Sequence, residues 1–384
     1  MKSDGLASSL HGRLLTLDAH LDAPVHFSRP GWSFGDRHEH EHDIAQLDLP
    51  RLEDGNLSGG FFVVYTAQGP LTVEGYAQAR AAALSRSGEI DATIERFSDR
   101  IGAARTAADA EQLHREGKVV AFKSLENCYP LGEDLATLGE FHGQGVRLAG
   151  PVHNFSNQFG DSATDRVLWN GLSALGREWV AEMNRLGILI DASHASDAAF
   201  DDMLSLSSTP VLLSHSGSRA IFDTPRNIDD GRLRRLAASG GAIGFTTIFL
   251  SEFHGGPERK ALFGRLATIS SLDAAGQARL AAEWRAMDAV APIWDADLDR
   301  YMEALLHVID VAGIDHVCFG ADFDGGGGIP GLEDVTRLPR ITERLQEAGL
   351  SDADVGKLWS GNLLRILRAA EAKATDSAAL GALA

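Results

Sequence analysis

The amino-acid sequence predicts an α/β protein of the (β/α)8, or TIM, barrel class. Eight apolar runs occur along the 384 residues, and segments with helical periodicity lie between them. The runs are almost continuously apolar, which is typical of parallel strands that are buried on both faces. Eight such strands that alternate with helices close into a barrel.

The predicted elements follow one another in chain order. The first strand ends in the string LTLDAHLDA, and the second contains GFFVVYT. Apolar residues at helical spacing follow several of the strands. The strands are predicted at residues 14–22, 60–66, 119–126, 146–153, 188–194, 211–215, 242–249 and 317–322, and the helices include 76–100, 131–142, 172–186 and 230–238.

The connection between the seventh and eighth strands is much longer than most others. Residues 257–312 predict several helices, which carry Trp284, Met287 and Trp294. Such side chains are usually core residues, so we favour helices that pack on the flank of the barrel or on a partner subunit. A lid over the site is the alternative. We expect one domain over residues 1–373, and the small-residue segment 374–384 as a frayed tail.

Composition excludes several classes of protein. Lys and Arg number 35 against 54 Asp and Glu, a formal charge of −19, which argues against nucleic acid or an anionic membrane as a partner. There are two cysteines and no CxxC motif, which fits a reducing cytoplasm. The N-terminus has no signal-peptide pattern, and no run reaches the roughly 18 apolar residues of a membrane span. We therefore expect a cytoplasmic protein.

Five side chains that bind metal ions stand at the ends of the predicted strands. His20 and Asp22 lie two residues apart and therefore point to the same face of the first strand. Glu126, His194 and His215 end the third, fifth and sixth strands. Five ligands exceed one tetrahedral zinc site and suit two ions about 3.5–4 Å apart. Glu126 is the natural bridge, because its strand stands between the two pairs.

Three further residues follow strands at the same end of the predicted barrel. His153 is suited to stabilise a developing oxyanion, or it is a hydrogen-bonded structural histidine. Arg226 is suited to clamp a carboxylate with two hydrogen bonds, or it lies on the surface. Asp322 is suited to hold an ammonium group or to shuttle a proton, or it caps backbone amides in its turn.

These residues lie in motifs that resemble those of the membrane dipeptidase (renal dipeptidase) family of zinc peptidases. The resemblance runs from His20 to the C-terminal string WSGNLLRIL. The order and spacing of the motifs are specific, whereas HxD alone is not. The matching motifs are the HxD at His20 and Asp22, Glu126 after a strand, GVRLAGPVHNFSN (145–157), DASHAS (191–196), SHSGSRAIFDTPRN (214–227) and GADFDG (320–325).

The resemblance implies a (β/α)8 barrel with a binuclear zinc centre that cleaves dipeptides, in some members with a D-residue at the C-terminal position. It implies one zinc ion on His20 and Asp22, a second on His194 and His215, and a bridge by Glu126. The resemblance also implies that His153 contacts the scissile carbonyl, that Arg226 faces the substrate carboxylate, and that Asp322 lies near the amino group and the leaving nitrogen.

Two departures from the family pattern concern the pocket wall. Ala19 and Leu21 flank the first metal histidine where Gly and Asn are common, and Asn127 follows the bridging Glu where Gly is common. The metal ligands are all kept, so the departures affect the preferred side chain of the substrate. The chain lacks the secretion and lipid-anchor segments of animal members and resembles the bacterial soluble members.

The sequence thus predicts a zinc-dependent dipeptidase in which a hydroxide bridging two zinc ions attacks L-Xaa-L-Xaa or L-Xaa-D-Xaa dipeptides. One alternative is an amidohydrolase that acts on another amide, a lactone or an ester. Such enzymes usually bridge their metals with a carboxylated lysine, but Lys123 lies on the opposite strand face from Glu126. A non-catalytic metal-binding barrel is the second alternative. A dipeptide is the expected partner, and a homodimer stays open.

Overall fold

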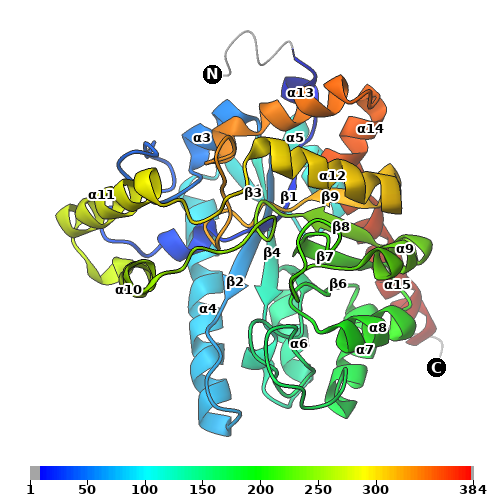
Figure 1. Cartoon of the computed structure of the whole chain (residues 1–384). Coiled ribbons are helices and arrows are strands. Elements are labelled where there is room, and N and C mark those ends of the chain that lie inside the picture. The colour runs from blue at the N-terminus through cyan, green and yellow to red at the C-terminus, as the bar shows by residue number, and fades with distance from the viewer. Residues whose placement is uncertain (1–8, 382–384) are drawn as a thin grey trace.

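Eight parallel strands form a nearly closed barrel in the computed structural model, which describes residues 9–381 and their side chains as far as residue 374. The eight-stranded barrel predicted from the sequence is confirmed (Figure 1). The strands lie in the order β1 (Asp18–Leu21), β2 (Gly59–Tyr65), β4 (Val119–Glu126), β5 (Val146–Ala149), β6 (Leu189–Asp191), β7 (Val211–Ser216), β8 (Ala242–Phe245) and β9 (Val317–Phe319).

One short strand was not predicted. β3 (Ile101–Ala103) pairs with the start of β4, where Ile101 lies opposite Val119. It follows directly after a long helix, so its three residues offer no alternating pattern of their own. β3 lies off the barrel path and leaves the order of the eight barrel strands unchanged.

The barrel closes between β1 and the segment after β9 through few contacts. Leu21 and Phe323 form a single parallel bridge, and the backbone N–H of Asp22 donates to the carbonyl of Phe323 over 3.0 Å. Lower down, the Asp18 carboxylate accepts the N–H of Ala321 over 3.2 Å, so a side chain takes the place of a backbone acceptor. Burial raises the pKa of Asp18 to about 7.

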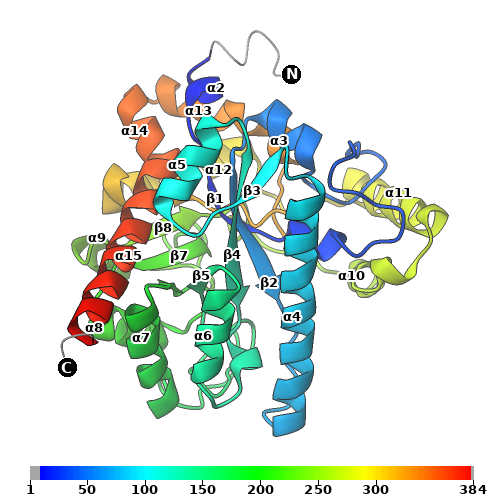
Figure 2. The same cartoon turned by 180° about the vertical axis from the view of Figure 1, so that it is seen from behind.

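Helices cover the outside of the barrel, and most begin at a Ser, Thr or Asp whose side chain accepts a backbone N–H of the first turn, as at Thr72, Ser173 and Asp229. Figure 2 shows α15 running along the outside of the barrel beside α5 and α7. The principal helices are α4 (Val73–Arg96), α5 (Ala107–Arg115), α6 (Ala136–Gly143), α7 (Ala174–Leu186), α8 (Asp197–Leu206), α9 (Asp230–Ala238), α12 (Leu298–Ala312) and α15 (Asn362–Gly381).

Shorter helices stand at the two ends of the chain and on the loop after β1. α15 continues across the predicted boundary at residue 374 as far as Gly381, and residues 382–384 lie outside the described part of the chain. The single domain over residues 1–373 and the frayed tail stay predictions. These shorter helices are α2 (Leu10–Arg13), α3 (Leu49–Gly55), α13 (Pro339–Glu347) and α14 (Asp352–Gly356).

Two apolar layers hold the fold together. Inside the barrel the rings of Phe61 and Phe122 stack with centroids 4.8 Å apart. Outside it, residues such as Trp179 and Phe141 fill the space between strands and helices. The interior below the strand ends is therefore filled with side chains, and only the C-terminal mouth is available for polar chemistry.

The long connection before β9 contains both an insertion and a regular barrel helix. α12 packs against α9 and β9 and is the helix expected between the last two strands. The insertion proper comprises α10 (Pro257–Leu266) and α11 (Ala274–Val290), which extend to one side of the barrel in Figure 1. These two helices enclose a small core of their own around Leu262 and Leu280.

None of the helices within residues 9–381 combines the length and the apolar character that crossing a membrane requires. The expected cytoplasmic location and the homodimer stay predictions.

Candidate metal centre

The predicted metal ligands converge around one oxygen, Oε1 of Glu126, at the C-terminal mouth of the barrel. Nε2 of His194 lies 3.1 Å from this atom, and Nε2 of His20 and Nε2 of His215 each lie 3.6 Å from it. Asp22 joins through Oδ2, 3.3 Å from Nε2 of His20. All five side chains are buried, although they come from four distant parts of the chain.

The ends of the strands deliver these side chains, but five of the predicted strands are shorter than expected, namely β1, β5, β6, β8 and β9. Glu126 is the last residue of β4 and His215 lies inside β7, as predicted. β6 ends at Asp191 and β5 ends at Ala149, so His194 and His153 lie in the following loops and not on strands. His194 has a left-handed backbone with φ of 67°, which ends strand geometry there.

The donor set fits bound metal ions. Nε2 of His20 is buried and has no hydrogen-bond partner among the described residues. Burial lowers the pKa values of His194 and His215 well below the ordinary value, so both rings are neutral, as a metal ligand requires. Three overlapping groups place their ligand atoms within 4.8 Å of one another: His20, Glu126 and His215; Glu126, His153 and His194; and His20, Asp22 and Asp322.

The charges at the site also favour a cation. Burial raises the pKa of Glu126 to about 8 and that of Asp322 well above its ordinary value. Burial lowers the pKa of His20, but the carboxylates of Glu126 and Asp22 outweigh it and raise the value to about 10. These carboxylates crowd a buried space, and a cation among them would restore their ionised forms.

Arg226 is a buried cation without an acidic partner. It is 6% exposed, and no carboxylate of the described residues lies within 4.0 Å of its guanidinium. Nη2 donates weakly to the carbonyl of His215 over 3.3 Å, Nε has no partner, and the ring of Phe249 lies 5.0 Å away. Its unused donors are consistent with the predicted carboxylate clamp and not with a surface arginine.

His153 lies at the edge of the same cluster. Its Nε2 is 3.9 Å from Oε1 of Glu126, and its ring packs against Tyr65 and against His194. Burial and the charge of Arg226 lower the pKa of His153 to about 4. The ring is therefore neutral near pH 7 and carries one N–H that can donate a hydrogen bond.

Asp322 stands in a tight loop after β9. Its Oδ1 is 3.9 Å from Nε2 of His20, and its backbone is left-handed with φ of 62°. Its carbonyl accepts the N–H of Gly327 over 2.7 Å. Gly325 packs so closely on the carboxylates of Asp22 and Asp322 that an added Cβ would clash with both.

Lys123 lies outside the cluster, as its strand position predicts. Its ammonium contacts Asp91 over 2.7 Å and Ser87 over 3.0 Å, both on α4, so the side chain points away from the barrel interior. A carboxylated lysine at this position would not reach the metal ligands.

The chain matches the family model described as membrane dipeptidase (peptidase family M19) over residues 6–380. The chain belongs to the membrane dipeptidase family. Membership makes it a dipeptidase and a metal-dependent hydrolase, in agreement with the resemblance seen in the sequence motifs.

Relatives and solved structures agree with this assignment. Dipeptidase tcpJ of Claviceps purpurea is 31% identical over 92% of this chain and 76% of that protein. The crystal structure of the probable dipeptidase PvdM from Pseudomonas aeruginosa is 29% identical, with a TM-score of 0.79 over 96% of this chain and 98% of that one. A metallopeptidase from Rhodobacter sphaeroides, liganded with a phosphinate mimic of L-Ala-D-Ala, is 27% identical, with a TM-score of 0.73 over 93% and 99%.

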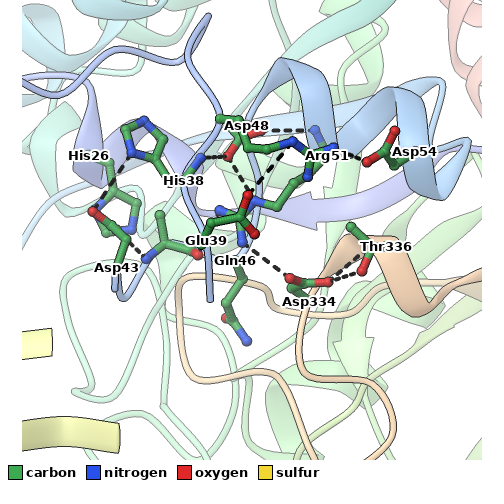
Figure 3. A network of polar contacts seen from close by, with 12 residues as sticks. His26, His38, Glu39, Asp43, Gln46, Asp48, Arg51, Asp54, Asp334 and Thr336 are labelled. Carbon is green, nitrogen blue, oxygen red and sulfur yellow. Dashed lines mark hydrogen bonds and ion pairs between the residues drawn. The ribbon is translucent and has the colours of Figure 1, made fainter. Parts of the chain in front are cut away.

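The loop after β1 of this dipeptidase is fixed by a polar network, which Figure 3 shows. Asp48 accepts from the backbone of His38 over 2.9 Å and pairs with Arg51 over 2.7 Å. Arg51 also reaches Asp334, 3.2 Å away in the segment after β9. The loop after β1 is thus held against the segment after β9, on the other side of the barrel seam.

The insertion helices pack on this loop. Arg29 pairs with Asp43 over 2.7 Å, and its Nε donates to Gln277 of α11 over 3.0 Å. Arg285 of α11 donates to the carbonyl of His40 over 2.7 Å. These contacts place α11 on the loop after β1, and the choice between a flank position and a lid stays a prediction.

Three residues beside the predicted ligands of this dipeptidase have no role that the sequence alone predicts. Asp18 accepts the N–H of His20 over 2.9 Å. Ser214 and Asp191 lie behind the rings of His215 and His20. Asp18 could be found from strand alternation, because it precedes His20 by two residues, but the contact between Asp191 and Ser214 joins two strands and has no local signal.

Proposed function

We propose that this dipeptidase binds two zinc ions, one on His20 and Asp22 and the other on His194 and His215, with Glu126 as the ligand common to both. The observation that carries the proposal is the position of Glu126 Oε1, within 3.6 Å of Nε2 of three histidines that come from β1, β7 and the loop after β6. No single tetrahedral ion uses five protein ligands.

When bound, the ions supply Lewis acidity and an acidified water for attack on the peptide carbonyl. The remaining work falls to the side chains of the chain itself. His153 donates a hydrogen bond to the oxygen of the scissile carbonyl as negative charge grows on it. Asp322 accepts the proton that the attacking water gives up and passes it to the leaving nitrogen, so that the C–N bond breaks to a neutral amine.

Two charged side chains beside the metal centre, Arg226 and Asp322, explain why the substrates would be dipeptides. Arg226 takes the C-terminal carboxylate, because it is buried with unused donors and lacks an acidic partner among the described residues. Asp322 faces the free amino group. A substrate with a blocked end leaves one of these buried groups unpaired, at a cost of about 1–3 kcal/mol or more for a charged group.

We propose L-Xaa-L-Xaa and L-Xaa-D-Xaa dipeptides as the classes to compare. The second class is suggested by the ligand of the Rhodobacter sphaeroides relative, a mimic of L-Ala-D-Ala. An amidohydrolase with a lysine bridge is not favoured, because Lys123 contacts α4 and not the ligand cluster.

The test is hydrolysis by protein that has been stripped of metal and reloaded with measured equivalents of zinc. The proposal expects activity to reach its maximum at two equivalents, on free dipeptides of one or both classes. N-acetylated dipeptides and dipeptide amides should be poor substrates. Saturation at one equivalent, or equal turnover of blocked and free dipeptides, would contradict the proposal.

A further inference from the structure

Ser214 and Asp191 form a buried pair that touches two of the metal histidines from behind. We propose that this pair sets which ring nitrogen His20 and His215 present to the metal ions, and that one hydroxyl thereby serves both ions. Ser214 and Asp191 are positioning residues, since they act through the two rings. The proposal rests on the proposed binuclear centre.

The hydroxyl of Ser214 lies among one carboxylate oxygen and two ring nitrogens, with Oγ of Ser193 as a fourth neighbour 3.4 Å away. Its Oγ lies 2.5 Å from Oδ2 of Asp191, 2.8 Å from Nδ1 of His215 and 3.4 Å from Nδ1 of His20. Ser214 is fully buried and Asp191 is 5% exposed, so water does not compete for these contacts. The hydroxyl has one hydrogen to donate and two lone pairs to accept with.

Asp191 decides where the single hydrogen goes. Its other oxygen, Oδ1, accepts the backbone N–H groups of Ser193 over 3.0 Å and of Ser214 over 2.9 Å. These two N–H groups and the hydroxyl of Ser214 approach the carboxylate as donors, so both of its oxygens act as acceptors. Ser214 therefore donates its hydrogen to Oδ2 of Asp191, and its lone pairs face the two rings.

The rings must then carry hydrogen on the nitrogen that faces Ser214. Nδ1–H of His215 donates to Oγ at a normal distance, and Nδ1–H of His20 donates at the longer distance of 3.4 Å. In each ring Nε2 is left with its lone pair, and each Nε2 lies 3.6 Å from Glu126 Oε1. A carboxylate behind a histidine ligand usually fixes the ring in this way by direct contact. Here the carboxylate of Asp191 acts through one serine hydroxyl, which contacts two rings.

His194 provides the contrast within the same site. Its Nδ1 is buried and has no partner among the described residues. Its ring instead packs against the rings of His153 and His215. The pair of Ser214 and Asp191 therefore supports one histidine from each proposed zinc site, and its loss should weaken both sites together.

The experiment measures zinc dissociation constants by competition with a chromophoric chelator, on the full chain and on Ser214→Ala. The expected result is weaker binding at both sites, by about 10–100-fold, the usual cost of losing an outer partner of a metal histidine. The larger loss should fall on the site of His215, which is nearer. Asp191→Asn should give the same pattern, because its amide can donate to Ser214 and free the hydroxyl to donate to a ring.

Ser193→Ala is the matched control. Ser193 also lies buried beside Ser214, 3.4 Å away, but its hydroxyl accepts the backbone N–H of His215 and touches neither ring. This control should keep both dissociation constants near those of the wild type. Equal losses in Ser193→Ala and Ser214→Ala, unchanged binding in Ser214→Ala, or weakening at one site alone would overturn the proposal.

A second measurement on the wild type needs no variant to fold. Nuclear magnetic resonance of the zinc-loaded chain labelled with ¹⁵N-histidine reports which ring nitrogen keeps its proton. The proposal expects a proton on Nδ1 and zinc on Nε2 for both His20 and His215. Zinc on Nδ1 of either ring would overturn it, whereas failure of the wild type to bind two zinc ions would instead overturn the proposed function.

Discussion

Nε2 of His194 lies 3.1 Å from Oε1 of Glu126, although Glu126 ends β4 and His194 follows β6, two strands that are not neighbours in the barrel. The approach depends on the left-handed backbone of His194, a conformation that costs about 1–3 kcal/mol for a residue other than glycine. The loop after β5 holds it there, because Ala163 donates its N–H to the carbonyl of His194 over 2.8 Å. The loop that carries His153 therefore also supports a metal ligand.

Glu126→Gln should abolish most of the dipeptidase activity. The amide keeps the shape of the side chain but loses the negative charge that two ions would share. We expect kcat/KM to fall by more than the roughly 100-fold that loss of an outer-shell partner costs. Steady-state kinetics together with metal analysis check this, and near-normal turnover with two bound zinc ions would contradict the role of Glu126.

Arg226→Lys should weaken binding of free dipeptides much more than it weakens folding. A lysine keeps the charge but loses the two-pronged hydrogen bond to a carboxylate. A charge-assisted hydrogen bond contributes about 1.5–3 kcal/mol, so KM should rise by about tenfold or more. Dipeptide amides are the control substrates, and their kinetics should not change. An equal change on amides would mean that Arg226 does not face the carboxylate.

Lys123→Met should leave activity and metal content unchanged. Lys123 is 4% exposed, but its partner Asp91 is largely exposed, so the ion pair adds no more than about 1 kcal/mol to the free energy of unfolding. Thermal unfolding and kinetics of the variant check this. Loss of metal from a folded Lys123→Met protein would instead favour the alternative of an amidohydrolase whose metal ions are bridged by Lys123.

Gly325→Ala should damage the active site without unfolding the barrel. The added Cβ would collide with the carboxylates of Asp22 and Asp322, which must then move. Gly88→Ala is the control, because a Cβ at that position in α4 meets no atom within 4 Å. This control should keep full activity and gain about 0.5–1 kcal/mol of stability. Comparable activity in both variants would show that Gly325 does not set the spacing of the two carboxylates.

Much of the fold and of the site could be predicted from the sequence, because the barrel strands lie side by side in the same order as along the chain. Apolar runs predicted the barrel strands, and the residues at their ends predicted the proposed ligands, which lie around Glu126. The HxD of His20 and Asp22 was informative because side chains two positions apart point to the same face of a strand. The two side chains do meet, although β1 ends at Leu21, just before Asp22.

Features that depend on contacts between distant segments could not be predicted. β3 pairs with β4 through three residues that have no pattern of their own. The ends of β5 and β6 are set by loops that turn back over the mouth, so His153 and His194 follow strands and do not belong to them. α12 is the ordinary barrel helix between β8 and β9. The two inserted helices α10 and α11 precede it, so the sequence does not show which helix of the long connection belongs to the barrel.

The most direct test of the binuclear centre is anomalous diffraction at the zinc edge from crystals of the zinc-loaded protein. The account predicts two zinc peaks, each at a coordination distance of about 2.0–2.2 Å from a carboxylate oxygen of Glu126. His20 and Asp22 should complete one site, and His194 and His215 the other. A single peak at this mouth of the barrel, or two peaks that Glu126 does not join, would contradict it.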